Sequence, residues 1–389
     1  MTKVAFYAKI GILGLLVAIG IYSLYLQTTD GLHLTGASDL VPWGIYIPTG
    51  AFFIGISAGT AIIGLMIHGF AREDYTPIGT RAIIAGLCSL IAGMLFVVSD
   101  VGVPIRMLLI PWVLRNMTSP FVYSALSYYT FGLLLLVDLY YAVKITRGNA
   151  SDGDKKIAKW LAIGTFIFAI IVLAAISGLI FATVKSREFW HSSLVPPHFV
   201  ISGLVTGTAV MILGALITAR TSGKELVSKK TLSHMAKLLA LFLVVNIFFD
   251  LYDIIWINYG ASPEGIQALS LLTTTYLPSF GLHVGGLIVA LIILVYNQGK
   301  NALGLSIASI LALAGVAAYR FNLIIVGQLI PQLPGLPEIV YIPTLHEISV
   351  VIGIAALALL LYTVGTTVIP MEEKKSTKMQ AQPIWKNSK

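Results

Sequence analysis

Long stretches that carry almost no charge constrain this chain more than any other feature. The stretch from Ile10 to Thr29 holds no charged residue over twenty positions. A helix needs about 20 mostly apolar residues to cross about 30 Å of hydrocarbon. Ten segments meet this requirement, near residues 7–27, 46–70, 80–100, 122–144, 158–183, 198–219, 235–257, 280–298, 301–321 and 346–369. The sequence therefore predicts an all-α integral membrane protein with ten transmembrane helices.

The composition predicts that one membrane domain fills the chain. Charged residues make up 11% and hydrophobic residues 57% of the 389 positions, whereas a soluble domain has about 25% charged residues. The longest polar stretches, an outer loop before Leu282 and a tail after Met371, are too short for a soluble domain. The net charge of +8 is spread over short loops, which indicates contact with a lipid bilayer and no binding of nucleic acid.

The basic residues also predict the orientation. Twenty of the 25 Lys and Arg residues fall on one side of the ten spans, on the side of both termini and of the 144–159 and 220–237 loops. The positive-inside rule places this side in the cytoplasm, so we expect a multi-pass protein of the cell membrane with both termini cytoplasmic. Four tryptophans fall at the outer ends of spans, as interfacial tryptophans do: Trp43, Trp112, Trp190 and Trp256.

An internal repeat relates two segments at an offset of 148 residues. Pro48, Gly55, Gly59, Thr60 and Ala61 in the first correspond to the same residue types in the second. The partners are Pro196, Gly203, Gly207, Thr208 and Ala209. Both segments start outside, so the repeat is parallel. The glycine spacing is typical of closely packed membrane helices, and we favour that role over a ligand site.

The repeat predicts two four-helix bundles flanked by two extra helices. The first helix and its outer loop would cover residues 1–40, and the two bundles residues 41–190 and 191–333. The tenth helix would cover 334–371, and a basic cytoplasmic tail 372–389. The single cysteine, Cys88, excludes a disulfide framework and an iron–sulfur ligand set within this chain.

Ionisable residues inside the spans gather toward the outer side. Asp100 ends the third span, Asp250 and Asp253 share one face of the seventh, and only Asp138 lies well toward the inner side. Three further candidates open spans from outside: His198, His283 and Glu347. Such groups are costly in a bilayer and are functional candidates, although residues at span ends also meet water.

This outer cluster offers the chemistry that a quinone requires. A quinone needs an apolar slot for its tail, hydrogen-bond donors for its carbonyls, and a carboxylate or histidine for the two protons of its two-electron reduction. A transporter site would contain the same residue types, so composition alone leaves both open.

Two sets of motifs resemble a known family. The run Ser99-Asp100-Val-Gly102-Val-Pro104-Ile-Arg106, followed by Thr118-Ser119-Pro120, resembles the NrfD family, which includes the membrane subunit of polysulfide reductase. Trp43-Gly-Ile-Tyr46 is similar as well. Arg320-Phe-Asn322, Gly327-Gln328 and Tyr341-Ile-Pro343-Thr-x-x-Glu347 resemble the ten-helix HybB branch, found with uptake hydrogenases.

The resemblance implies a haem-free subunit that exchanges electrons between a quinone, of the menaquinone type, and a partner protein. It implies an extracytoplasmic iron–sulfur ferredoxin-like subunit and a molybdopterin or nickel–iron catalytic subunit as partners, in a sulfur or polysulfide reductase or a hydrogenase. No haem, iron–sulfur cluster or metal is expected in this chain, which would be one subunit of an oxidoreductase complex.

The resemblance also assigns roles to residues. Asp100 would exchange protons with the quinone and Arg106 would pair with it, although a structural salt bridge at a helix end is the alternative. Trp43 and Tyr46 would line the head group, and His198 opens span six as the first helix of polysulfide-reductase subunits does. Tyr123 and Ser124 stand where the family often has Trp-Gly. The ionisable residues of the spans, and not the resemblance, suggest the proton path, which would use Asp138, Asp250, Asp253, His283 and Glu347.

Two other functions fit parts of the pattern. A haem b anchor would need two facing histidines at matched depth, and His198 and His283 open spans from the same side. A secondary transporter would account for the repeat and the buried acids.

Overall fold

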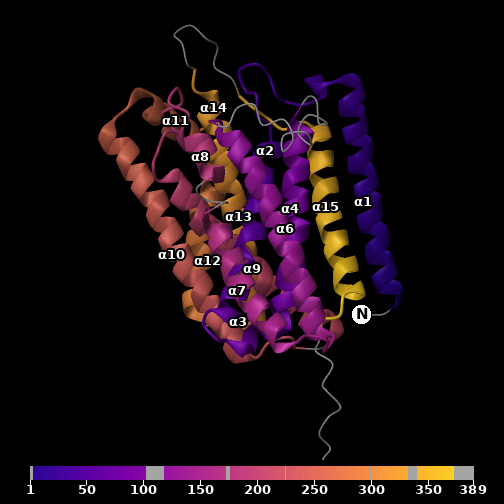
Figure 1. The fold of residues 1–389 in the computed structure, drawn as a ribbon. Coiled ribbons are helices and arrows are strands. Elements are labelled where there is room, and N and C mark those ends of the chain that lie inside the picture. Colours follow the sequence, from indigo (N-terminus) through magenta and orange to yellow (C-terminus); the bar gives the residue numbers. More distant parts are fainter. Residues whose placement is uncertain are drawn as a thin grey trace, which may run out of the picture.

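The structure is a computed structural model that describes residues 3–101, 118–171, 176–223, 225–297, 299–331 and 340–371. All regular elements of these residues are helical (Figure 1). Within them, nine helical segments are long and apolar enough to cross a membrane. The described part of the chain is thus a bundle of roughly parallel and antiparallel helices, as a multi-pass membrane protein requires.

The long helices are α1 (Lys3–Asp30), α4 (Thr76–Asp100), α6 (Pro120–Thr146), α7 (Asp152–Ile170), α9 (Val195–Ser222), α10 (Lys229–Gly260), α12 (Leu277–Asn297), α13 (Ala302–Phe321) and α15 (Leu345–Val368). The shorter ones are α2 (Tyr46–Gly59), α3 (Ile62–His68), α8 (Ser177–Ala182), α11 (Pro263–Thr273) and α14 (Gly327–Leu329). Single-turn elements are η1 (Leu32–Leu34), η2 (Glu73–Tyr75) and a π-helical turn, η4 (Asn322–Val326).

The helices differ from the expected pattern in two places, and a third lies partly outside the described residues. The described parts of the span expected at 158–183 are α7 and α8; residues 172–175 lie outside the described residues, and this span is not among the nine segments found in the described part of the chain. The span at 46–70 is divided into α2 and α3, where the Thr60 hydroxyl donates to the Ser57 carbonyl oxygen at 2.7 Å. The loop expected before Leu282 contains a helix, α11, capped by Ser262, whose hydroxyl accepts from the Gly265 amide.

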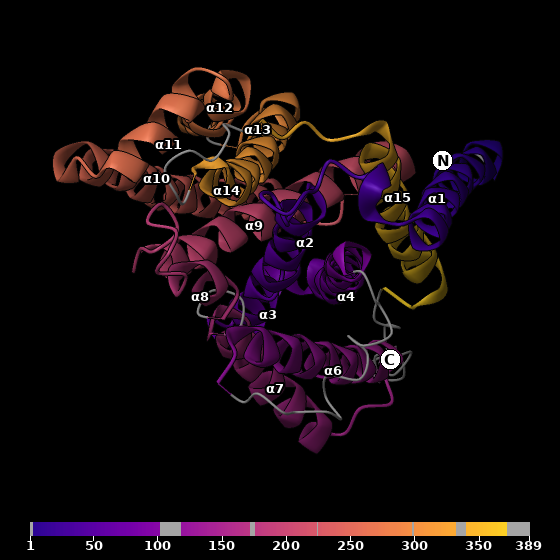
Figure 2. The same ribbon diagram turned by 90° about the horizontal axis from the view of Figure 1, so that it is seen from above.

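Two helices that the repeat relates lie at the centre of the molecule. Helices α2 and α9 pack against each other, with α4, α6 and α7 on one side and α10, α12 and α13 on the other (Figure 2). Helix α1 packs against α15 at the edge, and α15 packs against α4. The first and last helices of the chain are therefore neighbours.

The repeat glycines make the contact between α2 and α9. A Cβ added at Gly59 would overlap the Gly203 carbonyl oxygen, and one at Gly207 would overlap the backbone of Gly59. At Gly55 the nearest atom to such a Cβ would be the Gly203 Cα, at 3.7 Å. Only glycine permits this approach at Gly59 and Gly207, so the structure supports the packing role of the spacing.

Polar residues end the helices outside the hydrocarbon region. Ser151 and Asp154 form a reciprocal capping box at the start of α7. The Lys144 ammonium lies 2.8 Å from Oδ1 of Asp154, and together with the Ser151 amide and hydroxyl it holds the pKa of Asp154 at about 2. These contacts fix the turn between α6 and α7.

Candidate functional site

A buried carboxylate from α10 joins three helices. Oδ1 of Asp250 lies 2.9 Å from Nε2 of His283 on α12 and 3.3 Å from Nε2 of His198 on α9. The Asn246 amide donates to Oδ2 of Asp250 at 3.0 Å. All four residues are buried. A carboxylate inside a bilayer must be paired or hydrogen-bonded, and this one has three polar neighbours.

Two residues of α13 extend the cluster. The Tyr319 ring stacks on His198, with 4.1 Å between the ring centroids. Arg320 is 1% exposed. Its Cζ lies 3.4 Å from the centroid of the Phe199 ring, and its Nη2 donates to Oγ of Ser202 at 2.7 Å. Nε and Nη1 of Arg320 have no hydrogen-bond partner among the described residues. In the sequence, Arg320 stands out as an ionisable residue near the outer end of its span and as part of a motif.

A cavity of about 390 Å³ reaches this cluster. We name it the outer cavity because the charge count predicts that this end of the molecule faces outward, and inner denotes the opposite end. Its walls come from α10, α11, α12, α13, η4 and the 188–195 segment. Its polar lining includes Asp250, Asp253, His283, Tyr319 and Asn322, and its apolar lining includes Trp256, Leu269, Leu272 and Phe280. A mostly apolar cavity with a few convergent polar groups is the usual form of a small-molecule site.

Two polar atoms beside the cavity have no hydrogen-bond partner among the described residues. These are Nδ2 of Asn322 and Nδ1 of His283. The other functional atoms of the same side chains are occupied, because Oδ1 of Asn322 accepts from Ser279 at 2.6 Å and Nε2 of His283 contacts Asp250. Buried polar atoms in proteins normally have a partner, so these two are available to a ligand.

The 184–194 segment, part of which lines the cavity, is fixed to the end of α14. Nη1 of Arg187 donates to the carbonyl oxygens of Gly327, Gln328 and Ile330 at the end of α14. Burial lowers the pKa of Arg187, and the Glu264 carboxylate raises it. The guanidinium supplies a donor to carbonyl oxygens that the helix end leaves without one.

The structure brings His198, His283, Asp250 and Asp253 together. The sequence predicts all four in the outer half of the membrane. Nδ1 of His198 lies 4.0 Å from Oδ2 of Asp253. The two imidazoles contact the same carboxylate oxygen. A haem b anchor needs two imidazoles opposed across a gap, and this arrangement is different.

Three residues assigned to the quinone head group by resemblance contact other parts of the chain. Trp43 stacks on Trp190 with 5.5 Å between centroids, and the Tyr46 hydroxyl donates to Gln27 at 2.8 Å. Asp100 interacts with the backbone of Gly44. None of these three residues lines the outer cavity. Arg106 lies outside the described residues.

Tyr123 and Ser124, at the start of α6, also lie away from that cavity. The Tyr123 side chain is 45% exposed. The Ser124 hydroxyl donates to the Pro120 carbonyl oxygen at 2.9 Å, which is a contact within its own helix. Neither residue lines the outer cavity, so their contact with a quinone stays a prediction.

Glu347 caps the last helix. Its Oε2 accepts from the amides of Gly36 and Thr344 at 3.0 and 2.8 Å, and its Oε1 accepts from the Tyr341 hydroxyl at 2.8 Å. Burial, followed by the Glu347 carboxylate, raises the pKa of Tyr341, so its hydroxyl keeps the proton that it donates. The carboxylate ties the 31–45 segment to α15.

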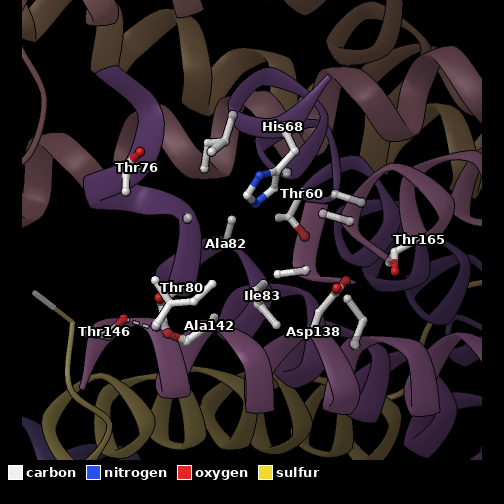
Figure 3. Close-up of a pocket in the computed structure, with 18 of the residues that line it drawn as sticks. Thr60, His68, Thr76, Thr80, Ala82, Ile83, Asp138, Ala142, Thr146 and Thr165 are labelled. Carbon is white, nitrogen blue, oxygen red and sulfur yellow. Dashed lines mark hydrogen bonds between the residues drawn. The ribbon is translucent and has the colours of Figure 1, made fainter. Parts of the chain in front are cut away.

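Asp138 lies apart from the outer groups, in the half of α6 that ends at Thr146. It is 8% exposed and lines an inner cavity of about 340 Å³ together with His68 and several threonines (Figure 3). The described residues hold no group of three or more His, Cys, Asp or Glu side chains arranged to bind a metal ion.

The helices and the buried acid–imidazole cluster define a multi-pass membrane protein with a partly polar cavity at one end. The chain belongs to the NrfD family, because a profile of the family described as Polysulphide reductase, NrfD, matches residues 33–332.

Its relatives are membrane subunits of reductases. The chain is 28% identical to the Hdr-like menaquinol oxidoreductase integral membrane subunit of Archaeoglobus fulgidus, over 93% of both chains. It is 23% identical to a selenate reductase subunit of Mesobacillus selenatarsenatis, over 94% of both chains. It is 24% identical to a protein of Halobacterium salinarum named as a dimethyl sulfoxide reductase membrane subunit, over 93% of this chain and 91% of the relative.

Proposed function

We propose that this chain is the quinone-interacting membrane subunit of a respiratory oxidoreductase complex. It would exchange electrons between a menaquinone-type quinone and an extracytoplasmic iron–sulfur subunit, which connects to a molybdopterin or nickel–iron catalytic subunit. The relatives are subunits of reductases, and one is named for menaquinol. The observation that carries the proposal is the outer cavity, which combines apolar walls with the Asp250–His283 pair.

The cavity fits a quinone head group by volume and by chemistry. About 390 Å³ accommodates a one- or two-ring head group, and cavities of about 300–1,000 Å³ are typical of small-molecule sites. Nδ2 of Asn322, which has no partner among the described residues, can donate to a carbonyl oxygen. Trp256 and Ile257 line the cavity on the side of α10, where an apolar tail could leave toward lipid.

His283 is suited to proton transfer at this head group. When the neutral imidazole carries its proton on Nε2, that N–H donates to Asp250 and Nδ1 is free to accept a proton. Asp250 then stabilises the imidazolium that forms, as the carboxylate of a catalytic triad does. In the reverse direction the imidazolium gives the proton back. A bound quinone supplies the two-electron chemistry.

We also propose the orientation and the internal symmetry. Twenty of 25 basic residues fall on the side of both termini in the sequence, which supports a cytoplasmic position of this side and a position of the outer cavity near the opposite face. Helices α2, α4, α6 and α7 would form one bundle, and α9, α10, α12 and α13 the other. The packing of consecutive helices is the same in both sets, which supports this division.

A photoreactive quinone analogue tests the site. Irradiated with the assembled complex in membranes, it should label peptides of α10, α11 or α12, and excess menaquinone should prevent the labelling. Labelling confined to peptides with Trp43, Tyr46 or Asp100 would move the head group to the first bundle. If excess menaquinone prevents labelling of no peptide of this chain, the proposal is wrong.

A further inference from the structure

The inner cavity holds a carboxyl that the quinone chemistry does not use. It lies between α3, α4, α6 and α7, at the end of the molecule opposite to α11 (Figures 1 and 3). Asp138 comes from α6, six residues or about 9 Å before Lys144. Around it, the lining holds the hydroxyls of Thr60, Thr80 and Thr165.

Asp138 has no ion-pair partner among the described residues. The basic groups on the surrounding helices are His68 on α3, Arg81 on α4, Lys144 on α6, and Lys155, Lys156 and Lys159 on α7. The same helices carry these other titratable residues: Cys88, Asp100, Tyr123, Tyr128, Tyr129, Tyr140, Tyr141, Asp152 and Asp154. Lys144 pairs with Asp154 instead. The polar neighbour of the Asp138 carboxyl is the uncharged hydroxyl of Thr165, which is itself buried. A carboxylate in hydrocarbon without a cation beside it is costly, so this position favours binding of a proton.

An apolar layer separates the inner cavity from the polar groups of the outer half. Tyr128 lies ten residues before Asp138, about 15 Å along α6, and its hydroxyl bonds to Ser177 at 2.6 Å. Between them, Phe131 is 0% and Leu135 2% exposed. These side chains pack with Ile54, Ala58, Leu90 and Ala169 in one cluster. The described conformation thus offers Asp138 a polar environment on one side only.

We propose that Asp138 is a proton-binding site that exchanges its proton with water in the inner cavity, on the face of the membrane that carries the 144–159 loop. The O–H bond of the carboxyl breaks, the proton passes to cavity water, and the carboxylate recovers a proton by the reverse step. The Phe131–Leu135 layer blocks onward transfer to the outer half in this conformation. Naming the face as cytoplasmic rests on the orientation proposed above, whereas the site itself does not depend on quinone binding.

Dicyclohexylcarbodiimide tests this site, because the apolar reagent reacts with protonated carboxyls in apolar surroundings. The assembled complex is placed in sealed vesicles of both orientations, with the pH of each side set separately, and the modified peptides are measured by mass spectrometry. We expect labelling of Asp138 that declines as the pH rises on the side of the 144–159 loop. The pH of the other side should leave it unchanged.

Matched variants show whether the cavity is the route. Asp138→Asn should remove the label from the α6 peptide. Ala142→Leu, which adds volume at the cavity wall, should lower the labelling rate. Val137→Leu changes a neighbouring side chain that is 43% exposed and does not line the cavity, so it should leave that rate unchanged. Labelling that follows the pH of the opposite side, or absence of label on Asp138 while Asp253 is modified, would overturn the proposal.

Discussion

Nε2 of His283 lies 2.9 Å from Oδ1 of Asp250, so an imidazole from α12 and a carboxylate from α10 form one unit inside the membrane. The contact orients the ring and leaves Nδ1 without a partner among the described residues. Because Asn246 occupies the other oxygen of Asp250, the carboxylate is held in place from two sides. This relationship makes Asp250 the residue on which quinone chemistry would depend most.

Asp250→Asn should lower quinone-linked turnover of the assembled complex by about 10²–10⁴-fold, the usual contribution of acid–base groups. The amide has no charge to stabilise a protonated His283. Dye-linked activity of the catalytic partner should remain, because that assay bypasses this subunit. Asp253→Asn is the matched control, one turn further along α10 and on the same cavity but 4.0 Å from its nearest imidazole nitrogen. Equal losses in both variants would contradict the assignment.

The contact between α2 and α9 predicts a difference between two glycines of one motif. Gly59→Ala should lower the melting temperature of the purified protein, because its Cβ would overlap the Gly203 carbonyl and overpacking costs about 1–3 kcal/mol. Gly55→Ala should be tolerated, because the nearest atom to its Cβ lies at 3.7 Å. Thermal unfolding followed by light scattering would compare them, and equal melting temperatures would count against the close packing.

The contacts of Glu347 predict a structural role. Glu347→Ala leaves the Gly36 and Thr344 amides and the Tyr341 hydroxyl without their acceptor, and loss of a helix cap costs about 0.5–2 kcal/mol. We expect a lower melting temperature with normal quinone-linked turnover per folded complex. Lost turnover at an unchanged melting temperature would instead place Glu347 in the proton path, as the sequence predicts.

The sequence predicts the helical spans because absence of charge over twenty residues is a local property. It also predicts that the helices with the glycine spacing pack closely, because small residues four apart leave one helical face open. That α2 and α9 are each other's partners is known only from the structure. Helix α7 begins with Asp152, Asp154 and Lys155, whose charges suit a helix end outside the hydrocarbon, so this helix starts several residues before the span expected at 158–183.

The site is only partly visible in the sequence because its contacts are long-range. Asp250 and His283 are candidates as ionisable groups in apolar runs, but they are 33 residues apart and only the packing of α10 on α12 joins them. Asn322 and Tyr319 line the cavity although neither is ionised at neutral pH, so a search for charges in spans passes over them. The amide of Asn322, unpartnered among the described residues, becomes apparent only once the neighbours are known.

The orientation predicts the accessibility of the turn between α6 and α7. A cysteine at Asn149, which is exposed and lies just before the Ser151 cap, should react with a membrane-impermeant maleimide only in inside-out vesicles. The native Cys88 is 7% exposed and contributes little background. Reaction in intact cells would reverse the orientation and place the outer cavity in the cytoplasm.

Asp100 provides the comparison between the two candidate positions of the quinone. The sequence motif predicts that Asp100→Asn blocks quinone-linked turnover and leaves assembly intact. The structure places Asp100 at the end of α4 beside the backbone of Gly44, and the outer cavity is lined instead by residues of α10 to α13. We therefore expect Asp100→Asn to keep most quinone-linked turnover, while Asp250→Asn loses it.

Both Asp100 and Asp250 variants should be measured in one membrane preparation, with the amount of assembled complex and its dye-linked activity as references. Asparagine keeps the shape and much of the hydrogen bonding of aspartate but cannot exchange a proton, so a difference between the variants reports proton exchange rather than folding. If Asp100→Asn loses turnover and Asp250→Asn keeps it, the quinone reacts at the end of α4. The Asp250–His283 pair would then be a structural link between α10 and α12, because a buried carboxylate needs a partner wherever the chemistry occurs.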